Sequence, residues 1–389
     1  MIGKITLMPL TLYLFLFSCL LLGKASFGSS LKEVFSNRFL MGTIWHGYSV
    51  DGEENKFLAR EKALTATEFN VITAENCMKP SFTQPKEGIF TFAEGDDLVA
   101  FAEKHSIAVV GHTLVWKNDA PEWFFKDDSG AVVSRSVLIE RMKEHIRTVV
   151  GHYRGRIAYW DVVNEAIDTR WIQEEKRFDA FYKPCPWLDI IGPEYIEIAY
   201  RTAHEADPDA KLLYNDYNLD QPAKLDFALE MIAELRDRGI PIHDLGYQGH
   251  FFLNEPALPL IERVLKNSQK AGVPLHITEL DVSVLPNAWK HRGASVEDKF
   301  ELAAEFNPYP QGAPLSLLQE QARRYGDLFD LFVQYSDILE RVTFWGVWDG
   351  NSWRNYRPML DRTDYPLLFG REFEPKPAYD TVIKAAVDH

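Results

Sequence analysis

The sequence predicts a single (β/α)8 barrel, and two observations support this prediction. First, eight short apolar segments typical of strands alternate with eight helical segments, with no linker or shift of composition between them. Second, polar side chains recur at the carboxyl end of nearly every predicted strand. A barrel places all of those ends at one mouth, and barrels run past 250 residues as one unit, so one domain suits a chain of 389 residues.

The elements follow one another in a regular order. A short helix, 31–37, precedes the first strand, and a helix over 377–386 closes the chain. The predicted strands are 39–45, 69–75, 107–113, 157–163, 211–215, 244–248, 274–282 and 342–347. The helices between them are 53–68, 95–105, 136–153, 193–206, 222–238, 257–271 and 314–335.

Local signals support individual elements. The fourth and seventh strands are runs of β-branched and other apolar residues that become polar only where they leave the core. The third helix between strands follows a capping region at Ser134. The fifth begins at Pro222 and stops at Gly239, and the sixth stops at Gly272.

A doubly wound open sheet is the alternative architecture. Such a sheet binds its ligand at one switch point and often carries a Gly-rich phosphate turn after the first strand. The first strand here is followed by no such turn, and polar residues end nearly all of the strands. Both features favour the barrel.

The first residues are typical of a secretory signal. Lys4 precedes a largely apolar run over 5–22, and small residues follow it between 23 and 30. We therefore predict a signal peptide over residues 1–28, a catalytic domain over 29–389 and a secreted or periplasmic protein. An uncleaved anchor remains the alternative because the run approaches membrane-spanning length, and Cys19 lies in a poor context for lipidation.

Charge and cysteine content limit the partners. The net charge of −15 argues against nucleic acid, and we expect a monomer with no membrane contact after signal cleavage. Cys77 and Cys185 would remain in the mature chain, and the sequence leaves open whether they form a disulfide. Two cysteines alone make no zinc site.

The polar residues at the predicted strand ends form the candidate site. Any one of them alone could be a helix cap or a satisfied core group. The full set is harder to explain in this way, because an unpaired buried polar group costs roughly 1–3 kcal/mol. In strand order they are Glu75, Asn76 and Lys79; His112 and Trp116; Asn164 and Glu165; Asn215, Asp216, Tyr217 and Asn218; Gln248 and His250; Glu279 and Asp281; and Trp345, Asp349 and Trp353.

This set suits a neutral polyhydroxyl ligand, because amides bind hydroxyls and indoles stack on the apolar faces of sugars. Cleaving a glycosidic bond needs two carboxyl groups, one protonated and one ionised. Glu165 and Glu279 end the fourth and seventh strands, which lie nearly opposite in an eight-stranded ring. Their side chains can therefore meet over the mouth at the ~5–5.5 Å required for nucleophilic attack.

Neighbours suggest a role for each side chain. Glu279 and Asp281 are two residues apart on a strand and so share a face, and a cationic His250 between them would keep the nucleophile ionised. The apolar and aromatic residues before Glu165 favour the protonated form that a general acid needs. Asn164 could donate a hydrogen bond to the 2-hydroxyl of the sugar.

At these residues the sequence resembles family 10 glycoside hydrolases, the retaining endo-β-1,4-xylanases. Residues 160–166, Trp-Asp-Val-Val-Asn-Glu-Ala, and 278–281, Thr-Glu-Leu-Asp, resemble the acid/base and nucleophile segments of that family. Further similar blocks follow in order over residues 31–387, and several ordered blocks are far more specific than one motif. They lie at 73–79, 111–116, 214–218, 248–250, 345–347, 352–353 and 375–379.

The resemblance implies the fold, the reaction and the roles of the residues. Glu165 would be the acid/base and Glu279 the nucleophile of xylan hydrolysis, with His250 and Asp281 supporting Glu279 and no cofactor or metal. Tyr217 and Asn218 would lie on the leaving-group side. The residues on the non-reducing side would be Glu75, Asn76, Lys79, His112, Trp116, Gln248, Trp345 and Trp353.

The sequence departs from the family pattern at two places. Lys117, Asn118 and Asp119 follow Trp116, where the family has His and, two residues on, Gln. Trp348 stands where the family generally has a small residue. Both differences bear on the shape of the cleft, and so on the decoration or chain length that it prefers.

Three rival functions are open. A metal-dependent barrel hydrolase could use histidines as ligands, although His46 lacks a paired histidine and alternation from Glu279 predicts that His276 faces the helices. A non-catalytic sugar-binding protein should have lost one glutamate, and both are present. Hydrolysis of another β-1,4-glucan would retain the chemistry and change only the polymer.

Overall fold

The structure is a computed structural model that describes residues 29–47, 56–291 and 304–388. The predicted signal segment, 1–28, and the first residues of the predicted helix 53–68 lie outside this part of the chain. Among the described residues, no helix combines the length and the apolar character that crossing a membrane requires.

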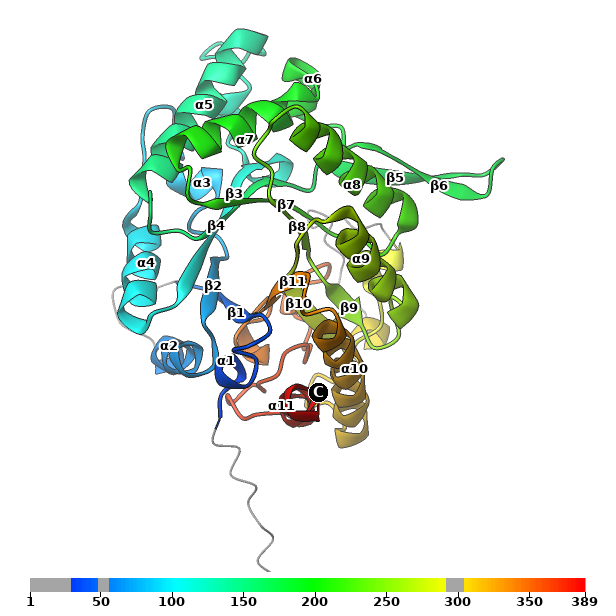
Figure 1. Cartoon of the computed structure of the whole chain (residues 1–389). Coiled ribbons are helices and arrows are strands. Elements are labelled where there is room, and N and C mark those ends of the chain that lie inside the picture. Colours follow the sequence, from blue (N-terminus) through cyan, green and yellow to red (C-terminus); the bar gives the residue numbers. More distant parts are fainter. Residues whose placement is uncertain (1–28, 48–55, 292–303, 389) are drawn as a thin grey trace, which may run out of the picture.

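Eight parallel strands form a closed barrel (Figure 1). Closure comes from β11, which pairs in parallel with β1 on one side and with β10 on the other. The barrel strands are β1 (Leu40–Trp45), β2 (Val71–Ala74), β3 (Ala108–Trp116), β4 (Tyr159–Asn164), β7 (Lys211–Asp216), β8 (Asp244–Tyr247), β10 (Leu275–Ser283) and β11 (Leu339–Phe344). The predicted barrel is therefore confirmed.

Helices surround the barrel in Figure 1, and each long helix lies between two successive barrel strands or closes the chain. The long helices are α2 (Lys56–Glu68), α4 (Ala93–His105), α5 (Arg135–His152), α7 (Glu194–Ala206), α8 (Pro222–Asp237), α9 (Leu258–Ala271), α10 (Leu315–Gln334) and α11 (Pro377–Asp388). Shorter helices are α1 (Leu31–Val34), α3 (Pro80–Thr83) and α6 (Pro186–Ile191). Apart from the undescribed start of α2, the long helices begin and end within two residues of their predicted bounds.

Three features went unpredicted. The segment after β4 forms an antiparallel hairpin of β5 (Ile167–Ile172) and β6 (Arg177–Tyr182), which projects from the barrel in Figure 1. A short strand, β9 (His250–Phe252), pairs with the end of β10. The last barrel strand spans Leu339–Phe344 and therefore begins three residues earlier than the predicted strand.

A glycine on one strand makes room for an aromatic ring on the next. Gly111 on β3 lies against the buried ring of Trp160 on β4, and a Cβ atom at position 111 would lie 2.2 Å from that ring. Only a residue without a side chain leaves room for the indole there. The small residue thus lets an aromatic side chain fill the core from β4, the strand that leads to Glu165.

The barrel interior contains a buried polar network. Arg341 on β11 donates from Nε to Nδ1 of His276 at 2.9 Å, and its Nη1 donates to Thr73 at 3.2 Å. Nε2 of His276 lies 3.1 Å from Asp244. The Nη2 atom of Arg341 also lies 3.8 Å from Asp161. These side chains lie on five different barrel strands and tie them together.

The predicted orientation of His276 is wrong. Its partners, Asp244 and Arg341, place it inside the barrel and not against the helices. The cause is an irregular register on β10 between Ile277 and Leu280, which breaks the simple alternation counted back from Glu279.

The two cysteines within the described residues are unbonded. Cys77 and Cys185 are both buried thiols. Burial raises the pKa of Cys77 to about 12 and raises that of Cys185 as well. The disulfide that the sequence left open is therefore absent between these two residues.

Candidate active site

A cleft of about 670 Å³ opens at the carboxyl ends of the barrel strands. Of the strand-end residues predicted from the sequence, all but Asn215, Asp216, Asp281 and Asp349 line it. Asp281 contacts His250 on the wall and Asn215 contacts Glu279, while Asp216 and Asp349 form buried ion pairs with Lys224 and Lys376. The predicted residues in the lining are Glu75, Asn76, Lys79, His112, Trp116, Asn164, Glu165, Tyr217, Asn218, Gln248, His250, Glu279, Trp345 and Trp353. The two long excursions after β4 and β10 also contribute, through Asp168, Lys183, Asn287 and Trp289.

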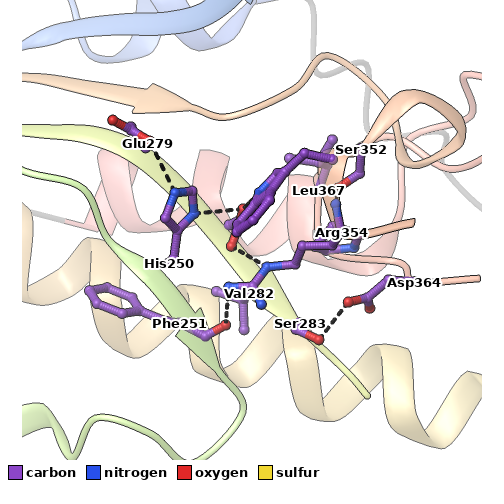
Figure 2. Close-up of polar contacts among 12 residues, drawn as sticks. His250, Phe251, Glu279, Val282, Ser283, Ser352, Arg354, Asp364 and Leu367 are labelled. Carbon is purple, nitrogen blue, oxygen red and sulfur yellow. Dashed lines mark hydrogen bonds and ion pairs between the residues drawn. The ribbon is translucent and has the colours of Figure 1, made fainter. Parts of the chain in front are cut away.

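His250 joins the two carboxylates of β10 (Figure 2). Its Nε2 lies 3.0 Å from Oε2 of Glu279, and its Nδ1 lies 2.9 Å from Oδ2 of Asp281. Both ring nitrogens therefore face carboxylate oxygens, which is the arrangement that a doubly protonated imidazolium satisfies.

The charges of this group support one another. Burial alone would lower the pKa of His250, but the carboxylates of Asp281 and Glu279 outweigh it and raise the pKa to about 9. Burial alone would raise the pKa of Asp281, but Arg354 and the imidazolium outweigh it and lower that pKa. His250 is therefore a cation, and Asp281 an anion, at neutral pH.

Asp281 is also held by two donors from the segment after β11. Nε1 of Trp353 donates to Oδ2 at 2.8 Å, and Nε of Arg354 donates to Oδ1 at 2.7 Å. Arg354 is buried and also donates to the carbonyl oxygen of Phe251 at 3.3 Å (Figure 2). Sequence analysis did not identify Arg354, although it directly follows the predicted Trp353 in the chain.

The second oxygen of Glu279 has a partner of its own. Nδ2 of Asn215 donates to Oε1 of Glu279 at 2.8 Å and to Oδ1 of Asn164 at 3.0 Å. The hydroxyl of Thr278 donates to Oδ1 of Asn215 at 2.6 Å and so fixes which way the amide faces. Asn215 was recognised as a polar strand end but received no role, because a sequence does not reveal which strand ends touch.

Glu165 occupies an unusual backbone position at the end of β4. Its φ is 55°, in the left-handed region that non-glycine residues rarely adopt. The amide N–H of Glu165 donates to the carbonyl of Asn215 at 2.9 Å, and that of Ala166 donates to the hydroxyl of Tyr214 at 3.0 Å. Such strained positions cluster at functional sites, where the surrounding structure holds them.

The carboxylate of Glu165 faces two donors. Nε2 of Gln248 donates to Oε1 at 3.1 Å, and Nζ of Lys183 lies 3.6 Å from Oε2. The same lysine lies 3.5 Å from the hydroxyl of Tyr217. Lys183 directly follows β6, the second strand of the hairpin. The sequence gave no signal that this residue lies in the cleft beside Glu165.

One part of the wall combines polar and aromatic side chains from β2, β3 and β11. Lys79 donates to Oδ1 of Asn76 at 2.8 Å, and its Nζ lies 5.1 Å from the ring centroid of Trp116. His112 packs edge-on against Trp345, with ring centroids 5.4 Å apart. The wall thus offers hydrogen-bonding groups beside indole faces, as a sugar site requires.

Tyr217, on another part of the cleft wall, is held in place by Lys224 and Asp216. Nζ of Lys224 lies 3.5 Å from its ring centroid and forms a buried ion pair with Asp216 at 2.7 Å. Asp216 also accepts a hydrogen bond from the amide N–H of Tyr217 at 2.9 Å. Asn218 follows with a left-handed backbone, φ 52°.

The two departures from the family pattern, at residues 117–119 and at Trp348, have different effects on the cleft. Lys117 and Asp119 line the cleft, and Asp119 accepts hydrogen bonds from Ser81. Trp348 instead stacks on Phe373 at 4.4 Å and donates to Glu61 at 3.0 Å, and it is absent from the cleft lining. Only the first departure therefore shapes the cleft.

The four histidines that a metal-dependent hydrolase could use as ligands contact different carboxylates. His46 lies 2.5 Å from Glu75, His112 lies 2.9 Å from Asp161, and His276 lies 3.1 Å from Asp244, while His250 joins Glu279 and Asp281. Within the described ranges, no group of three or more His, Cys, Asp or Glu side chains has an arrangement that could hold a metal ion.

Comparison with known proteins identifies the family. A model of glycosyl hydrolase family 10 matches residues 30–385, which is nearly the whole described barrel. The chain belongs to glycosyl hydrolase family 10. The resemblance drawn from the sequence blocks is thereby confirmed.

Individual proteins are similar to this chain over most of their length. Endo-1,4-beta-xylanase A of Xylanibacter ruminicola is 39% identical over 355 residues, which cover 91% of this chain and 93% of the relative. A GH10 endoxylanase retrieved from a sugarcane soil metagenome superimposes with a TM-score of 0.84 at 39% identity, covering 91% of this chain and 99% of that structure. A mutant structure in complex with xylotriose superimposes with a TM-score of 0.77 at 32% identity, covering 91% and 99%.

Proposed function

We propose that this family 10 protein is an endo-β-1,4-xylanase that retains the anomeric configuration, with Glu279 as nucleophile and Glu165 as acid/base. One observation carries the assignment: both glutamates line one cleft, and each is held in place by side chains from other strands. The relatives named as xylanases and the xylotriose complex support xylan as the substrate.

In the first step, Glu279 attacks the anomeric carbon while Glu165 gives its proton to the leaving oxygen, which forms a glycosyl-enzyme ester. Glu279 has hydrogen-bond partners on both oxygens, His250 and Asn215, which orient it for the attack. In the second step, Glu165 takes a proton from water, which attacks the same carbon and frees the sugar as its β-anomer.

The neighbours of Glu165 fit its two tasks. Gln248 and Lys183 stabilise the carboxylate that remains after protonation of the leaving group, and this carboxylate then acts as the base. Asn164, oriented by Asn215, donates to the 2-hydroxyl of the sugar at the point of cleavage.

The remaining residues hold the chain on either side of the cut. Tyr217 and Asn218 contact the leaving-group side. The non-reducing side is bound by Glu75, Asn76, Lys79, His112, Trp116, Gln248, Trp345 and Trp353, which supply both hydrogen bonds and stacking faces. The reaction uses no cofactor.

The proposal extends to location and assembly. Residues 1–28 act as a signal peptide and residues 29–389 as the catalytic domain, so the enzyme is secreted or periplasmic and reaches the polymer. It acts as a monomer, since the described cleft draws both glutamates from one chain.

Kinetics of two variants test the assignment. Glu279→Ala should abolish turnover of xylan and of activated aryl xylosides alike. Glu165→Ala should lose roughly 10²–10⁴-fold on xylan but much less in the glycosylation step with good leaving groups, which need no proton. Glu230→Ala on the exposed face of α8 is the control and should match the parent.

Three results would contradict the proposal. An active Glu279→Ala variant would remove the nucleophile, and equal losses for Glu165→Ala on both substrates would remove the acid role. Faster release of reducing sugar from cellulose or mixed-linkage glucan than from xylan would keep the chemistry and change the polymer.

A further inference from the structure

Arg357 is an arginine of the cleft that the reaction described above does not use. It lines the same cleft as Trp289, Trp353 and Arg354, and its amide N–H donates to the carbonyl of Trp353 at 3.1 Å. The residue as a whole is partly exposed, and its Nη1 atom is buried without a hydrogen-bond partner in the described part of the chain.

The neighbouring arginine shows what such a side chain does when it is structural. Arg354, three residues earlier, is buried. Its Nε donates to Asp281 in an ion pair, and its Nη2 donates to the carbonyl of Phe251. Arg357 forms no ion pair with any described carboxylate. Among the described residues its charge is therefore unpaired, on the wall of the cleft and four positions after the tryptophan that donates to Asp281.

Arg357 lies four positions after Trp353, a residue near the point of cleavage, and its amide N–H is bonded to the carbonyl of Trp353. Trp353 packs 4.7 Å from the ring of His250, which in turn contacts Glu279. Trp289 lies 6.1 Å from Trp353, so the two indoles form one aromatic wall. A sugar stacked on that wall would carry its substituents into the cleft that Arg357 also lines.

The positive charge of Arg357 indicates which kind of side group on the xylan chain it could bind. The backbone of xylan is neutral and does not need a cation, whereas the protein carries a net charge of −15 and the cleft contains several carboxylates. An anionic group would therefore be repelled unless a local cation received it. The planar guanidinium fork matches a carboxylate with two parallel hydrogen bonds.

We propose that Arg357 recognises the carboxylate of a uronic acid side group on the xylan chain, so that the enzyme prefers glucuronoxylan over neutral xylan at this position. This inference rests on the proposed xylanase function and adds the decoration that the cleft accepts. Arg357 acts as a specificity residue and takes no part in bond cleavage.

The test uses two matched substrates, a uronate-substituted xylo-oligosaccharide and the same compound with its carboxyl group reduced to an alcohol. The parent enzyme should cleave the charged compound with a higher kcat/KM. Arg357→Gln should lower kcat/KM on the charged compound about tenfold and leave the reduced compound unchanged, since a charge-assisted pair is lost. Arg357→Lys should retain part of the preference, and added salt should weaken it in the parent.

Controls separate the possible failures. Arg323→Gln, an exposed arginine on α10, should behave as the parent on both compounds. Equal losses for Arg357→Gln on both compounds, or no preference in the parent, would overturn the inference while leaving xylan hydrolysis intact. Loss of the preference in Lys117→Met and not in Arg357→Gln would assign recognition elsewhere. Failure to cleave any linear xylo-oligosaccharide would instead overturn the proposed function.

Discussion

The ionic group around His250 predicts how the stability of the protein depends on pH. The pKa of His250 is about 9 in the folded protein, against 6.5 for an ordinary histidine. A group whose pKa is raised by folding stabilises the fold fully below its unfolded pKa, and that stabilisation is lost as the pH rises through the folded pKa. The imidazolium should thus contribute in full below pH 6.5 and nothing well above pH 9.

The size of the effect follows from the shift. Each unit of pKa corresponds to about 1.4 kcal/mol, so a shift from 6.5 to about 9 is equivalent to about 3 kcal/mol of folding free energy. The perturbation is His250→Gln, which keeps an amide donor but carries no charge at any pH. Asp281 and Glu279 then face each other without the cation between them.

Urea denaturation across the pH range measures this contribution. The difference in unfolding free energy between the parent and His250→Gln should be largest near pH 6 and should shrink by about 3 kcal/mol toward pH 10. Titrating groups that do not contact His250 are common to both proteins and cancel in the comparison. A difference that stays constant with pH would refute the assignment of a cationic imidazolium between two carboxylates.

Three further predictions concern packing, positioning and metals. Gly111→Ala should destabilise the fold by about 1–3 kcal/mol, seen as a lower Tm, because the added methyl would overlap the ring of Trp160. Asn215→Ala should lower kcat on xylan about 10–100-fold with an unchanged circular dichroism spectrum, since Glu279 loses a donor at 2.8 Å; an unchanged kcat would remove it as a positioning residue. Activity on xylan should survive excess EDTA, and its loss with recovery on adding back a divalent cation would favour the metal-dependent rival.

The barrel itself could be predicted because its signals are local. Runs of β-branched residues and helix boundaries such as Pro222 and Gly272 mark each element without reference to the rest of the chain. The closed topology then places every strand end at one mouth, which explains why the polar residues that end the strands line one cleft.

The features that escaped prediction depend on contacts between distant segments. Lys183 approaches Glu165 only because the segment after β4 folds back as the β5–β6 hairpin. Arg354 lies in the segment after β11 and forms a buried ion pair with Asp281 on β10. The residues next to Arg354 in the sequence do not indicate this pair. Such residues become visible only once the strands are arranged in space.

Two positions show the limits of simple rules more precisely. Strand alternation failed at His276 because the register of β10 is irregular just before Glu279, and this irregularity has no signature in the side chains there. Trp348 seemed a candidate for the cleft by its place in the chain, yet it packs on Phe373 and donates to Glu61. Which face a residue presents at the end of a strand is set by the local backbone and not by counting.

The stereochemistry of the first product tests the two-glutamate mechanism most directly. Proton NMR during early hydrolysis of a xylo-oligosaccharide distinguishes the newly released anomer before mutarotation mixes the two forms. Attack by Glu279 followed by attack of water predicts that the β-anomer appears first. An initial α-anomer would mean a single inverting displacement, and Glu279 would then be no nucleophile.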